Sequence, residues 1–557
     1  MKFLKPFLII FLSCCCIIAC TSLKSTIVKP IIVPNLTLKK SKLTIPQWRN
    51  WIHKDIVQDT IPGISLDKAY NELIKEKLGD TIIVALLDNR IDSEHEEIKD
   101  YIWVNNKEIP NNGIDDDKNG YTDDVNGWNF LGNGKGENVD RANFEATRIV
   151  RKYKDVFESK EIEDIPQQLK KEFDLYRKAK RIYDDYLNLT EKRIASLDSF
   201  DKRKKDLYND LSKIYHDSLL SEKSIAKLLS KDSIINIKIA SYRYYLKHSG
   251  WSSSTREVQS RYLDIYLGLN SKERSVIGDN VDNIEDADYG NGNITASKTS
   301  SHDHAIKVAG ILAANRVNGL GIKGVSNILK IMPVCTSPSG DEQDKDIALG
   351  IKYAVNNGAK IIIITFTKYI VQREDWLMDA INYASSKDVL IVLSAGNSAK
   401  DSDLEITYPN DINEQNNEYV NNVIVVGGSS SSLNEELVAD FSNYGKRNVD
   451  IFAPAKSIYT TLRNNEYGYE SGTSMSAPIV AGIASLIRSY YPNLSASEVK
   501  QIIMESGVSY DIMVNKPSTS KEKKLVPFSS LSKSGKIVNA YNALVLAAEV
   551  SKKKKRN

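Results

Sequence analysis

A run of small and hydroxyl residues in the C-terminal third gives the strongest indication of chemistry in this chain. Residues 471–478 are Ser-Gly-Thr-Ser-Met-Ser-Ala-Pro, and Ile-Val-Ala-Gly follows. Glycine and small side chains allow a tight turn, and the small residues after it suit a helix packed closely inside a core. A serine at such a helix start, here Ser474, has backbone N–H groups directed at its reacting partner, where the helix also favours negative charge. The sequence therefore predicts a nucleophile for acyl transfer.

Residues 472–478 resemble the nucleophile motif of the subtilisin-like serine peptidases, the subtilases. In that family the catalytic residues occur in the order Asp, His, Ser along the chain. The resemblance extends over about residues 63–140 and 303–548 and leaves out the segment between them. It implies a subtilisin-like α/β fold, with a mostly parallel central sheet flanked by helices, and endopeptidase activity on protein or peptide substrates.

The resemblance assigns the acid of this site to Asp88, which ends the apolar run of residues 83–87. A carboxylate there accepts the Nδ1–H of a histidine, fixes its tautomer and stabilises the imidazolium. Asn89 and Arg90 replace the small hydroxyl residue and the glycine that the family usually has. We expect Arg90 to lower the pKa of the carboxyl group or to compete for its hydrogen bond.

The resemblance assigns the base to His304, four residues before the Val-Ala-Gly of residues 308–310. Ile306 and Lys307 depart from the family pattern, so the polar surroundings of the base are altered. His302 lies two residues away and receives no role from the resemblance. A metal-binding pair of His302 and His304 is the alternative, but no third ligand is evident.

Asn397 follows the apolar run of residues 391–395 and a glycine, and by resemblance it donates to the oxyanion of the tetrahedral intermediate. The expected reaction proceeds through an acyl-enzyme, with His304 taking the proton of Ser474 and Asp88 orienting the imidazole. No cofactor is expected for the chemistry. Because the surroundings of the acid and the base are altered, the alternative is a catalytically impaired subtilase-like protein that acts as a binding module at the cell envelope.

An acidic loop has the oxygen spacing found at the start of an EF-hand calcium loop. Residues 115–120 are Asp-x-Asp-x-Asn-Gly, with oxygens at alternate positions around a glycine turn. The twelfth position is Asn126 in place of a bidentate Glu, so a complete EF-hand is not expected. We expect a structural Ca²⁺, and a metal-free turn rich in Asp and Asn is the alternative. The expected ligands are Asp115, Asp117, Asn119, Tyr121 and Asp124.

Short β-branched runs alternate with amphipathic stretches in the parts that resemble the family. The runs are nearly continuous in apolar residues, which is typical of parallel strands buried on both faces. Between them, residues 347–355 and 376–384 have the spacing of one apolar helix face. This alternation predicts an α/β fold with ligands bound at the carboxyl ends of the strands. The predicted strands are residues 82–87, 328–334, 361–366, 389–394 and 423–426.

Residues 141–289 interrupt this alternation with Lys, Asp, Tyr and Leu at helical spacing. They predict a mainly helical insertion about the size of a small domain. The peptidase domain is then discontinuous and consists of residues 48–140 and 290–548. A solvated helical elaboration and a partner-binding module are both open interpretations of the insertion.

The N-terminus has the layout of an export signal. Two lysines precede an apolar stretch over residues 6–19, which is too short to span a bilayer as a stable helix of about 20 residues. Residues 17–20, Ile-Ile-Ala-Cys, resemble a bacterial lipobox, which implies removal of residues 1–19 and a lipid on Cys20. A plain signal peptide is the alternative. We expect residues 20–47 to be a tether, and the protein to be lipid-anchored in the bacterial cell envelope, on a periplasmic or cell-surface side that the sequence does not distinguish.

Composition narrows the partners further. The 557 residues include 75 Lys and Arg against 72 Asp and Glu, and a net charge of +3 is too small for this length to indicate nucleic acid. Residues 549–557 predict a basic, solvated tail. Cys335 is the single cysteine after Cys20, so no internal disulfide is expected in the body, and we interpret this thiol as part of the core. The sequence does not predict the oligomeric state.

Overall fold

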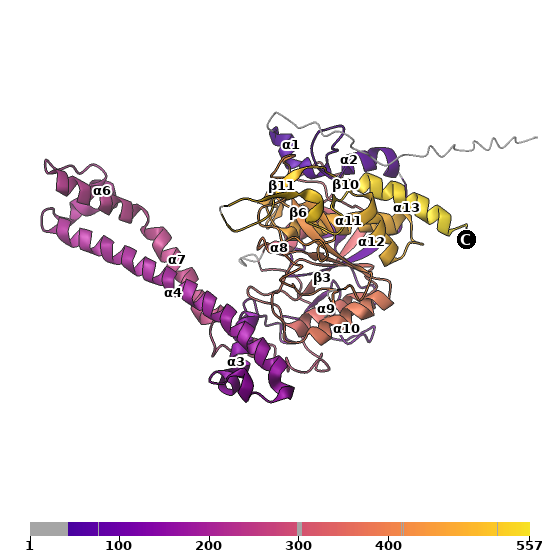
Figure 1. Cartoon of the computed structure of the whole chain (residues 1–557), viewed down its shortest axis with the longest axis horizontal. Coiled ribbons are helices and arrows are strands. Elements are labelled where there is room, and N and C mark those ends of the chain that lie inside the picture. Colours follow the sequence, from indigo (N-terminus) through magenta and orange to yellow (C-terminus); the bar gives the residue numbers. More distant parts are fainter. Residues whose placement is uncertain are drawn as a thin grey trace, which may run out of the picture.

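A nine-stranded sheet runs through the body of the protein in the computed structural model, which describes residues 43–75, 77–297, 303–413, 415, 417–520 and 522–556. Its order is β10-β13-β7-β6-β5-β4-β1-β3-β2 (Figure 1). Every neighbouring pair from β13 to β2 is parallel, and β10 pairs antiparallel with β13 at one edge. The strands are β1 (Ile82–Asp88), β2 (Trp128–Asn129), β3 (Leu329–Cys335), β4 (Ile361–Ile364), β5 (Leu390–Ser394), β6 (Val423–Ser429), β7 (Ile451–Pro454), β10 (Val508–Ser509) and β13 (Lys536–Ile537). The predicted parallel α/β sheet is confirmed.

Helices cover both faces of this sheet, which explains why its strands are apolar on both sides. In β1, Val84 and Leu86 join the core under one set of helices, whereas Ala85 and Leu87 join the core on the opposite face. The first face is covered by α2 (Leu66–Ala69), α8 (His304–Ala313), α11 (Thr473–Tyr490), α12 (Ala496–Ser506) and α13 (Ala540–Lys554). The second is covered by α9 (Asp344–Asn356) and α10 (Glu374–Ser386), which match the two predicted helices.

The small-residue helix predicted after the serine motif is α11, which lies at the centre of the body. Every residue from Thr473 to Ser489 is buried. Gly482 shows why small residues are needed, because a Cβ placed there would lie 2.6 Å from the Cβ of Val325. The helix therefore packs closely enough to fix the position of its N-terminal residues.

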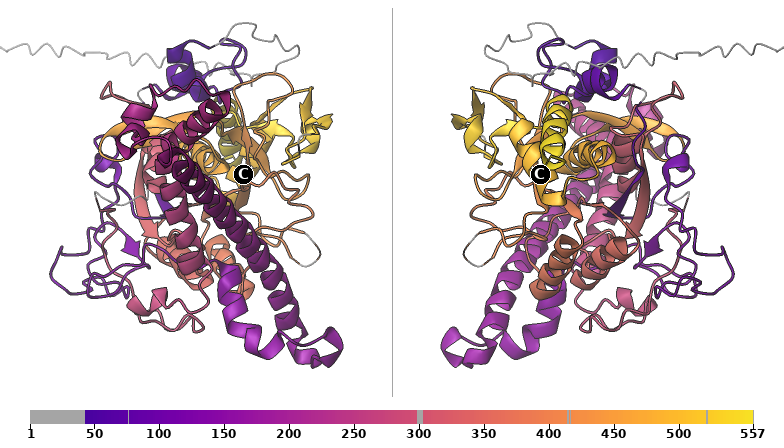
Figure 2. Two further views of the ribbon diagram at one scale, coloured as in Figure 1. Left: turned by 90° about the vertical axis from the view of Figure 1, so that its left-hand side faces the viewer. Right: turned by 90° about the vertical axis from the view of Figure 1, so that its right-hand side faces the viewer.

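The interrupting segment forms a helical arm that projects from the body (Figures 1 and 2). Its main helix, α4 (Lys170–Ser212), has 43 residues and is about 65 Å long at a rise of ~1.5 Å per residue. α6 (Ser233–Lys247) and α7 (Ser249–Arg261) return along α4, and α3 (Glu145–Phe157) lies at the base of the arm. The mainly helical insertion is confirmed.

Two antiparallel hairpins lie outside the main sheet. One pairs β8 (Ile458–Leu462) with β9 (Glu466–Glu470) and packs on α8, and the other pairs β11 (Met513–Asn515) with β12 (Leu525–Pro527). In the first hairpin, β9 leads directly into the predicted serine turn.

The N-terminal predictions fall largely outside the described residues. Cys20 and the apolar stretch before it lie there, and so does His302. The described chain opens on α1 (Ile45–Arg49), which begins inside the predicted tether, and α13 continues into the basic C-terminal segment as far as Lys554. Among the described helices, none combines the length and the apolar character needed to cross a bilayer.

Candidate active site

Asp88 and His304 meet at the carboxyl edge of the sheet. Asp88 is the last residue of β1, and His304 is the first residue of α8. The Nδ1 atom of His304 lies 2.7 Å from Oδ2 of Asp88, although 216 positions separate the two residues in the sequence. The carboxylate is buried, whereas the imidazole side chain is packed on most sides and 37% exposed.

The buried carboxylate of Asp88 is held by two further donors. The Thr365 hydroxyl donates to Oδ2 at 2.6 Å, and the backbone N–H of Asn89 donates to Oδ1 at 2.7 Å. The Asn89 side chain in turn accepts a hydrogen bond from the N–H of Ala305 at 3.2 Å, which ties the end of β1 to the start of α8. The residue that replaces the family's small hydroxyl residue therefore helps to align acid and base.

Arg90 does not take the role expected from its position. Its guanidinium donates to Oδ1 of Asp140 at 2.6 Å, and no contact between Arg90 and Asp88 is recorded among the described residues. The expected competition for Asp88 is therefore not seen, because Arg90 forms its ion pair with Asp140, the residue just before the insertion.

Three charged neighbours act on His304. Burial alone disfavours the imidazolium, but the charge of Asp88 and its hydrogen bond outweigh burial and raise the pKa of His304 above its usual value of 6.5. Lys307 lowers this pKa, and Glu470 raises it. Lys307 and Glu470 themselves form an ion pair at 2.6 Å. Because Lys307 lies on α8 and Glu470 ends β9, their contact also fixes the histidine helix against the strand that leads to the serine turn.

Ser474 and Asn397 face the same small space beside Gly472. A Cβ placed on Gly472 would lie 3.0 Å from Oγ of Ser474 and 3.4 Å from Nδ2 of Asn397. Glycine leaves this space open, so the hydroxyl and the amide can address one reacting group. The side chain of Ser474 lies at the start of α11 with only 7% exposure.

The amide of Asn397 has a fixed orientation. Its Oδ1 accepts hydrogen bonds from the N–H of Thr473 at 2.8 Å and from the Thr473 hydroxyl at 3.0 Å. A backbone N–H can only donate, so the oxygen must lie on this side, and Nδ2 remains as the donor next to Gly472. The Thr473 hydroxyl also accepts from the N–H of Gly396 at 3.0 Å, which joins the asparagine turn to the serine turn.

The structure thus brings the four predicted residues together as two pairs. The acid contacts the imidazole, and the serine hydroxyl shares a space with the asparagine amide. A hydrogen bond between His304 and Ser474 is not among the recorded contacts of the described residues. Catalytic hydrogen bonds of this kind are often long without substrate and tighten in its complex.

Two positioning residues were not identified from the sequence, namely Thr365 and Thr473. Each is a hydroxyl residue that follows a strand or turn at the same edge of the sheet as Asp88. The parallel register, which places Leu87 beside Ile364, would predict that the residue after Ile364 lies next to Asp88. Thr473 could have been identified because it directly precedes the predicted nucleophile, Ser474.

The acidic loop groups a different set of oxygens from the predicted one. Carboxylate oxygens of Glu108, Asp115 and Asp117 lie within 4.8 Å of one another, and Glu108 was not predicted. Asp124 points inward and accepts from the Tyr353 hydroxyl at 2.7 Å, and burial raises its pKa to about 6. Asn119 donates to Asp124, and the ring of Tyr121 packs edge-on against Tyr353 and Trp128.

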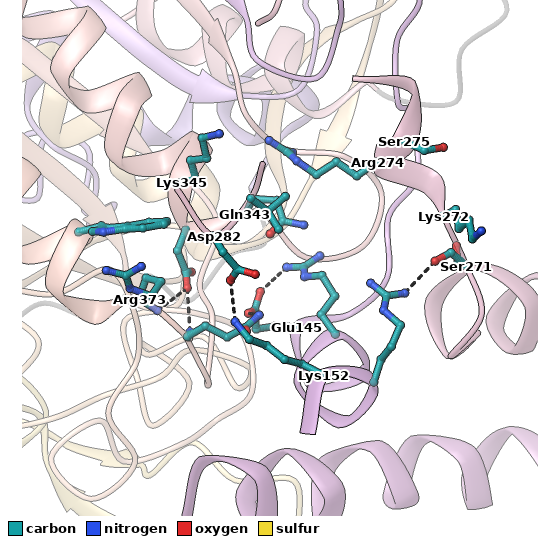
Figure 3. Close-up of a pocket in the computed structure, with 16 residues that line it drawn as sticks. Glu145, Lys152, Ser271, Lys272, Arg274, Ser275, Asp282, Gln343, Lys345 and Arg373 are labelled. Carbon is teal, nitrogen blue, oxygen red and sulfur yellow. Dashed lines mark hydrogen bonds and ion pairs between the residues drawn. The ribbon is translucent and has the colours of Figure 1, made fainter. Parts of the chain in front are cut away.

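A cavity of about 360 Å³ lies at the base of the arm and not at the Asp88–His304 pair (Figure 3). Five of its seven lining cations form ion pairs, among them Arg148 with Glu145, Lys152 with Asp282, and Arg373 with Asp375. We interpret it as the joint between arm and body.

One residue of this joint, Lys368, is close in sequence to Thr365, which contacts Asp88. Lys368, three residues after Thr365, is 1% exposed and contacts Glu145 of α3 at 3.2 Å and Asp344 of α9 at 2.5 Å. Burial opposes the charge of this lysine, yet the two carboxylates outweigh it and raise its pKa well above the usual value. The base of the arm is therefore anchored next to the segment that supports Asp88.

The chain is similar to a known peptidase family and to several proteases. The model of the subtilase family matches residues 79–530. A cell wall-associated protease of Bacillus subtilis (strain 168) is 27% identical over 394 residues, which cover 66% of this chain and 41% of that protein. The major intracellular serine protease of the same organism is 37% identical over 38% of this chain and 64% of its own length. Thermitase of Thermoactinomyces vulgaris is 33% identical over 40% of this chain and 70% of its own length.

These matches are extensive enough to show the family of the chain, but not the activity of the whole protein. The chain spans less than two thirds of the cell wall-associated and the intracellular protease, so the comparisons do not extend to the whole of either. The family model, by contrast, covers most of the chain, from just before β1 to beyond α12, and includes all four predicted site residues. The chain therefore belongs to the subtilase family.

Proposed function

We propose that this protein is a serine endopeptidase with Asp88, His304 and Ser474 as its catalytic triad. The observation on which the proposal depends is the 2.7 Å contact between Nδ1 of His304 and Asp88. This contact uses Nδ1 and leaves Nε2 of His304 available to the nucleophile. It lies at the same edge of the sheet as the space that Ser474 and Asn397 share. The names of the relatives, which are all proteases, support the same activity.

The proposed reaction uses each of these groups in turn. The Ser474 hydroxyl oxygen attacks the carbonyl carbon of the peptide bond while His304 accepts its proton. Asp88 holds the imidazole in the required tautomer and stabilises the imidazolium that forms. The carbonyl oxygen becomes an oxyanion, to which Nδ2 of Asn397 and the N–H of Ser474 donate.

The remaining steps return the enzyme to its starting state. His304 gives its proton to the leaving amine, so the C–N bond breaks and an acyl-enzyme remains on Ser474. Water then attacks the ester carbonyl, with His304 again as the base, and the free acid leaves. No cofactor takes part in these steps.

A matched pair of serine variants tests this proposal. Ser474→Ala should lower kcat for a peptide substrate by about 10⁶-fold, because the nucleophile is lost. Ser471→Ala removes a hydroxyl three residues away whose recorded partner is the backbone N–H of Ser457, and it should leave kcat within about twofold. Hydrolysis that persists unchanged in Ser474→Ala would contradict the assignment.

The impaired binding module is the alternative proposal. It depends on the altered residues around Asp88 and His304, and two of these have partners that support an active site instead. Arg90 pairs with Asp140, and Asn89 bridges the two catalytic elements. A purified wild-type chain that binds peptides but hydrolyses them no faster than Ser474→Ala does would favour the alternative.

We also propose a structural Ca²⁺ in the acidic loop, held by Glu108, Asp115 and Asp117. Three carboxylates with oxygens this close repel one another, and a divalent cation would neutralise them. Chelation should therefore lower the Tm of the wild type and have no effect on the double variant Asp115→Asn/Asp117→Asn. Equal Tm values with and without Ca²⁺ in the wild type would contradict the proposal.

For localisation we propose a lipid anchor on Cys20 and a place in the cell envelope. The lipobox-like sequence before Cys20 motivates this proposal. Cys20→Ser should move the protein from the membrane fraction to the soluble fraction, whereas Cys335→Ser, which changes a buried thiol, should not. Membrane association of Cys20→Ser equal to that of the wild type would contradict a lipid anchor.

A further inference from the structure

The far end of the arm concentrates exposed apolar side chains. We define the tip as residues 213–237, between the end of α4 and the first turns of α6. Among the described residues, 25 large apolar side chains are exposed, and five of them lie in this short segment. The exposed fraction of these residues ranges from 42% to 78%. They are Ile214, Leu219, Leu229, Ile234 and Ile237.

The five exposed side chains are separate from the hydrophobic core of the arm's end. The end of the arm has its own core, in which Leu211, Leu220, Ile225, Ile239 and Tyr242 pack together. The five exposed residues are not members of that cluster. An apolar patch left on a unit that already buries a core indicates a surface that binds something.

The end of the arm around the tip is positively charged, although the tip itself carries a net charge of only +1, from four Lys against the exposed Asp217, Glu222 and Asp232. Residues 202–247 contain eleven Lys and Arg against five Asp and Glu, a net charge of +6, whereas the whole chain carries +3. The rest of the chain is therefore net negative. At the tip, Lys223, Lys227 and Lys231 are exposed, and no ion pair is recorded for them among the described residues. Charge complementarity thus favours an anionic partner.

The arrangement of these groups favours a broad surface over a defined groove. Ile214 follows α4, Leu219 lies in the short helix Asp217–Leu220, Leu229 lies in the loop after the helix Glu222–Ile225, and Ile234 lies at the start of α6. They form no single helical stripe of the kind that a partner helix would need. The cations of the tip are all lysines, which act as point charges and lack the fixed fork by which arginine selects individual carboxylates.

The position of the tip allows it to contact a plane. The tip and α1 both lie toward the top of Figure 1, and the two views of Figure 2, turned about the vertical axis, keep them there. A flat surface at that side can contact the end of the arm while the body stands beside it.

We propose that the tip binds the surface of an anionic phospholipid bilayer. The exposed lysines are attracted to the lipid phosphates, and the five apolar side chains enter the boundary between headgroups and acyl chains. The proposal does not depend on peptidase activity, and it adds a contact distinct from the lipid proposed on Cys20. Two membrane contacts would hold the active site at a set distance and orientation from the bilayer.

Vesicle binding by the full chain tests this proposal. Cys20→Ser serves as the parent protein, because it removes the thiol proposed to carry lipid. It should sediment with vesicles of phosphatidylcholine containing about one third phosphatidylglycerol, and not with phosphatidylcholine alone. Raising the salt from about 0.1 M to about 1 M should release it, since screening shortens the reach of the charges from about 10 Å to about 3 Å.

Two sets of variants locate the contact. Lys223→Gln/Lys227→Gln/Lys231→Gln should lower partitioning onto anionic vesicles by about ten- to a hundredfold. Leu229→Ser/Ile234→Ser/Ile237→Ser should lower it at least about tenfold. This change removes little packing, because each of the three residues is at least 65% exposed.

The matched control neutralises three exposed lysines of the body, Lys99→Gln/Lys107→Gln/Lys360→Gln, and should retain binding within about twofold. Unchanged peptide hydrolysis in both tip variants would show that their bodies are folded.

Three results would overturn the proposal. They are equal binding to neutral and anionic vesicles, equal loss in the control and the tip variants, and failure to bind either vesicle. If the parent protein ignores vesicles but self-associates in a way that Leu229→Ser abolishes, the tip serves a second copy of the chain instead. Failure of peptide hydrolysis with intact vesicle binding would concern only the proposed peptidase.

Discussion

Lys368 in the body and Arg256 on the arm each contact two carboxylates, but in different surroundings. Lys368 is 1% exposed and contacts Glu145 and Asp344, both buried. Arg256 is 37% exposed and contacts Asp198 and Asp201 on α4, which are more exposed still. A cation between two carboxylates therefore has a different effect in each region. In the body it fixes one arrangement beside the proposed active site, and on the arm it lies on a solvated helix surface.

The largest effect should come from the acid of the body. Asp88→Asn keeps the shape of the side chain but favours the wrong tautomer of His304, so kcat should fall by about 10⁴-fold. Asp198→Asn, a matched change on the arm, should leave kcat unchanged. Peptide hydrolysis by the two purified variants makes this comparison, and similar rates in both would remove the distinction between the regions.

Breaking the joint should have the next largest effect, on stability. Lys368→Met leaves buried Asp344 without its cation and leaves Glu145 with Arg148 alone, which should cost about 3–5 kcal/mol in the free energy of unfolding. Arg256→Gln should show no measurable change, because water replaces its contacts. Denaturant unfolding of both variants tests this, and a wild-type midpoint for Lys368→Met would show that the joint adds nothing to stability.

The oxyanion donor should have a smaller effect that is confined to catalysis. Asn397→Ala removes Nδ2 while Ser474 and His304 remain, so kcat should fall by about 10²–10³-fold with little change in KM. The fold should persist, as judged by Tm. A rise in KM with unchanged kcat would instead assign Asn397 to substrate binding.

The smallest effect is a pair of opposite shifts in the pH profile. The base acts when neutral, and the pKa of His304 is raised, so kcat/KM should increase with pH through a midpoint above 6.5. Glu470 raises this pKa, so Glu470→Gln should move the acid limb to lower pH. Lys307 lowers it, so Lys307→Gln should move the limb to higher pH. Shifts in the same direction in both variants would show that loss of the ion pair, and not the individual charges, controls the base.

The sequence was most informative where local pattern and tertiary structure agree. The five predicted strands appear in the sheet as β1, β3, β4, β5 and β6, because apolar β-branched runs leave few alternatives to a strand buried on both faces. Asp88 and His304 were predicted by resemblance to one family, and the structure places them 2.7 Å apart.

What the sequence did not reveal depends on contacts between distant segments. Thr365, which follows β4, donates a hydrogen bond to Asp88 at the end of the neighbouring strand β1. Arg90 forms an ion pair with Asp140, fifty positions away. Glu108 joins the acidic loop from outside its motif. Such pairings follow from strand register and loop path, which a pattern within one segment does not encode.

The measurement that tests the central claim most directly is labelling with a fluorophosphonate probe, followed by mass spectrometry to locate the label. A serine reacts with the probe only when a neighbouring base activates it. The account predicts one labelled site, Ser474, in the wild type and loss of the label in both Ser474→Ala and His304→Ala. An unlabelled wild-type protein, or a label on Ser474 that survives His304→Ala, would contradict it.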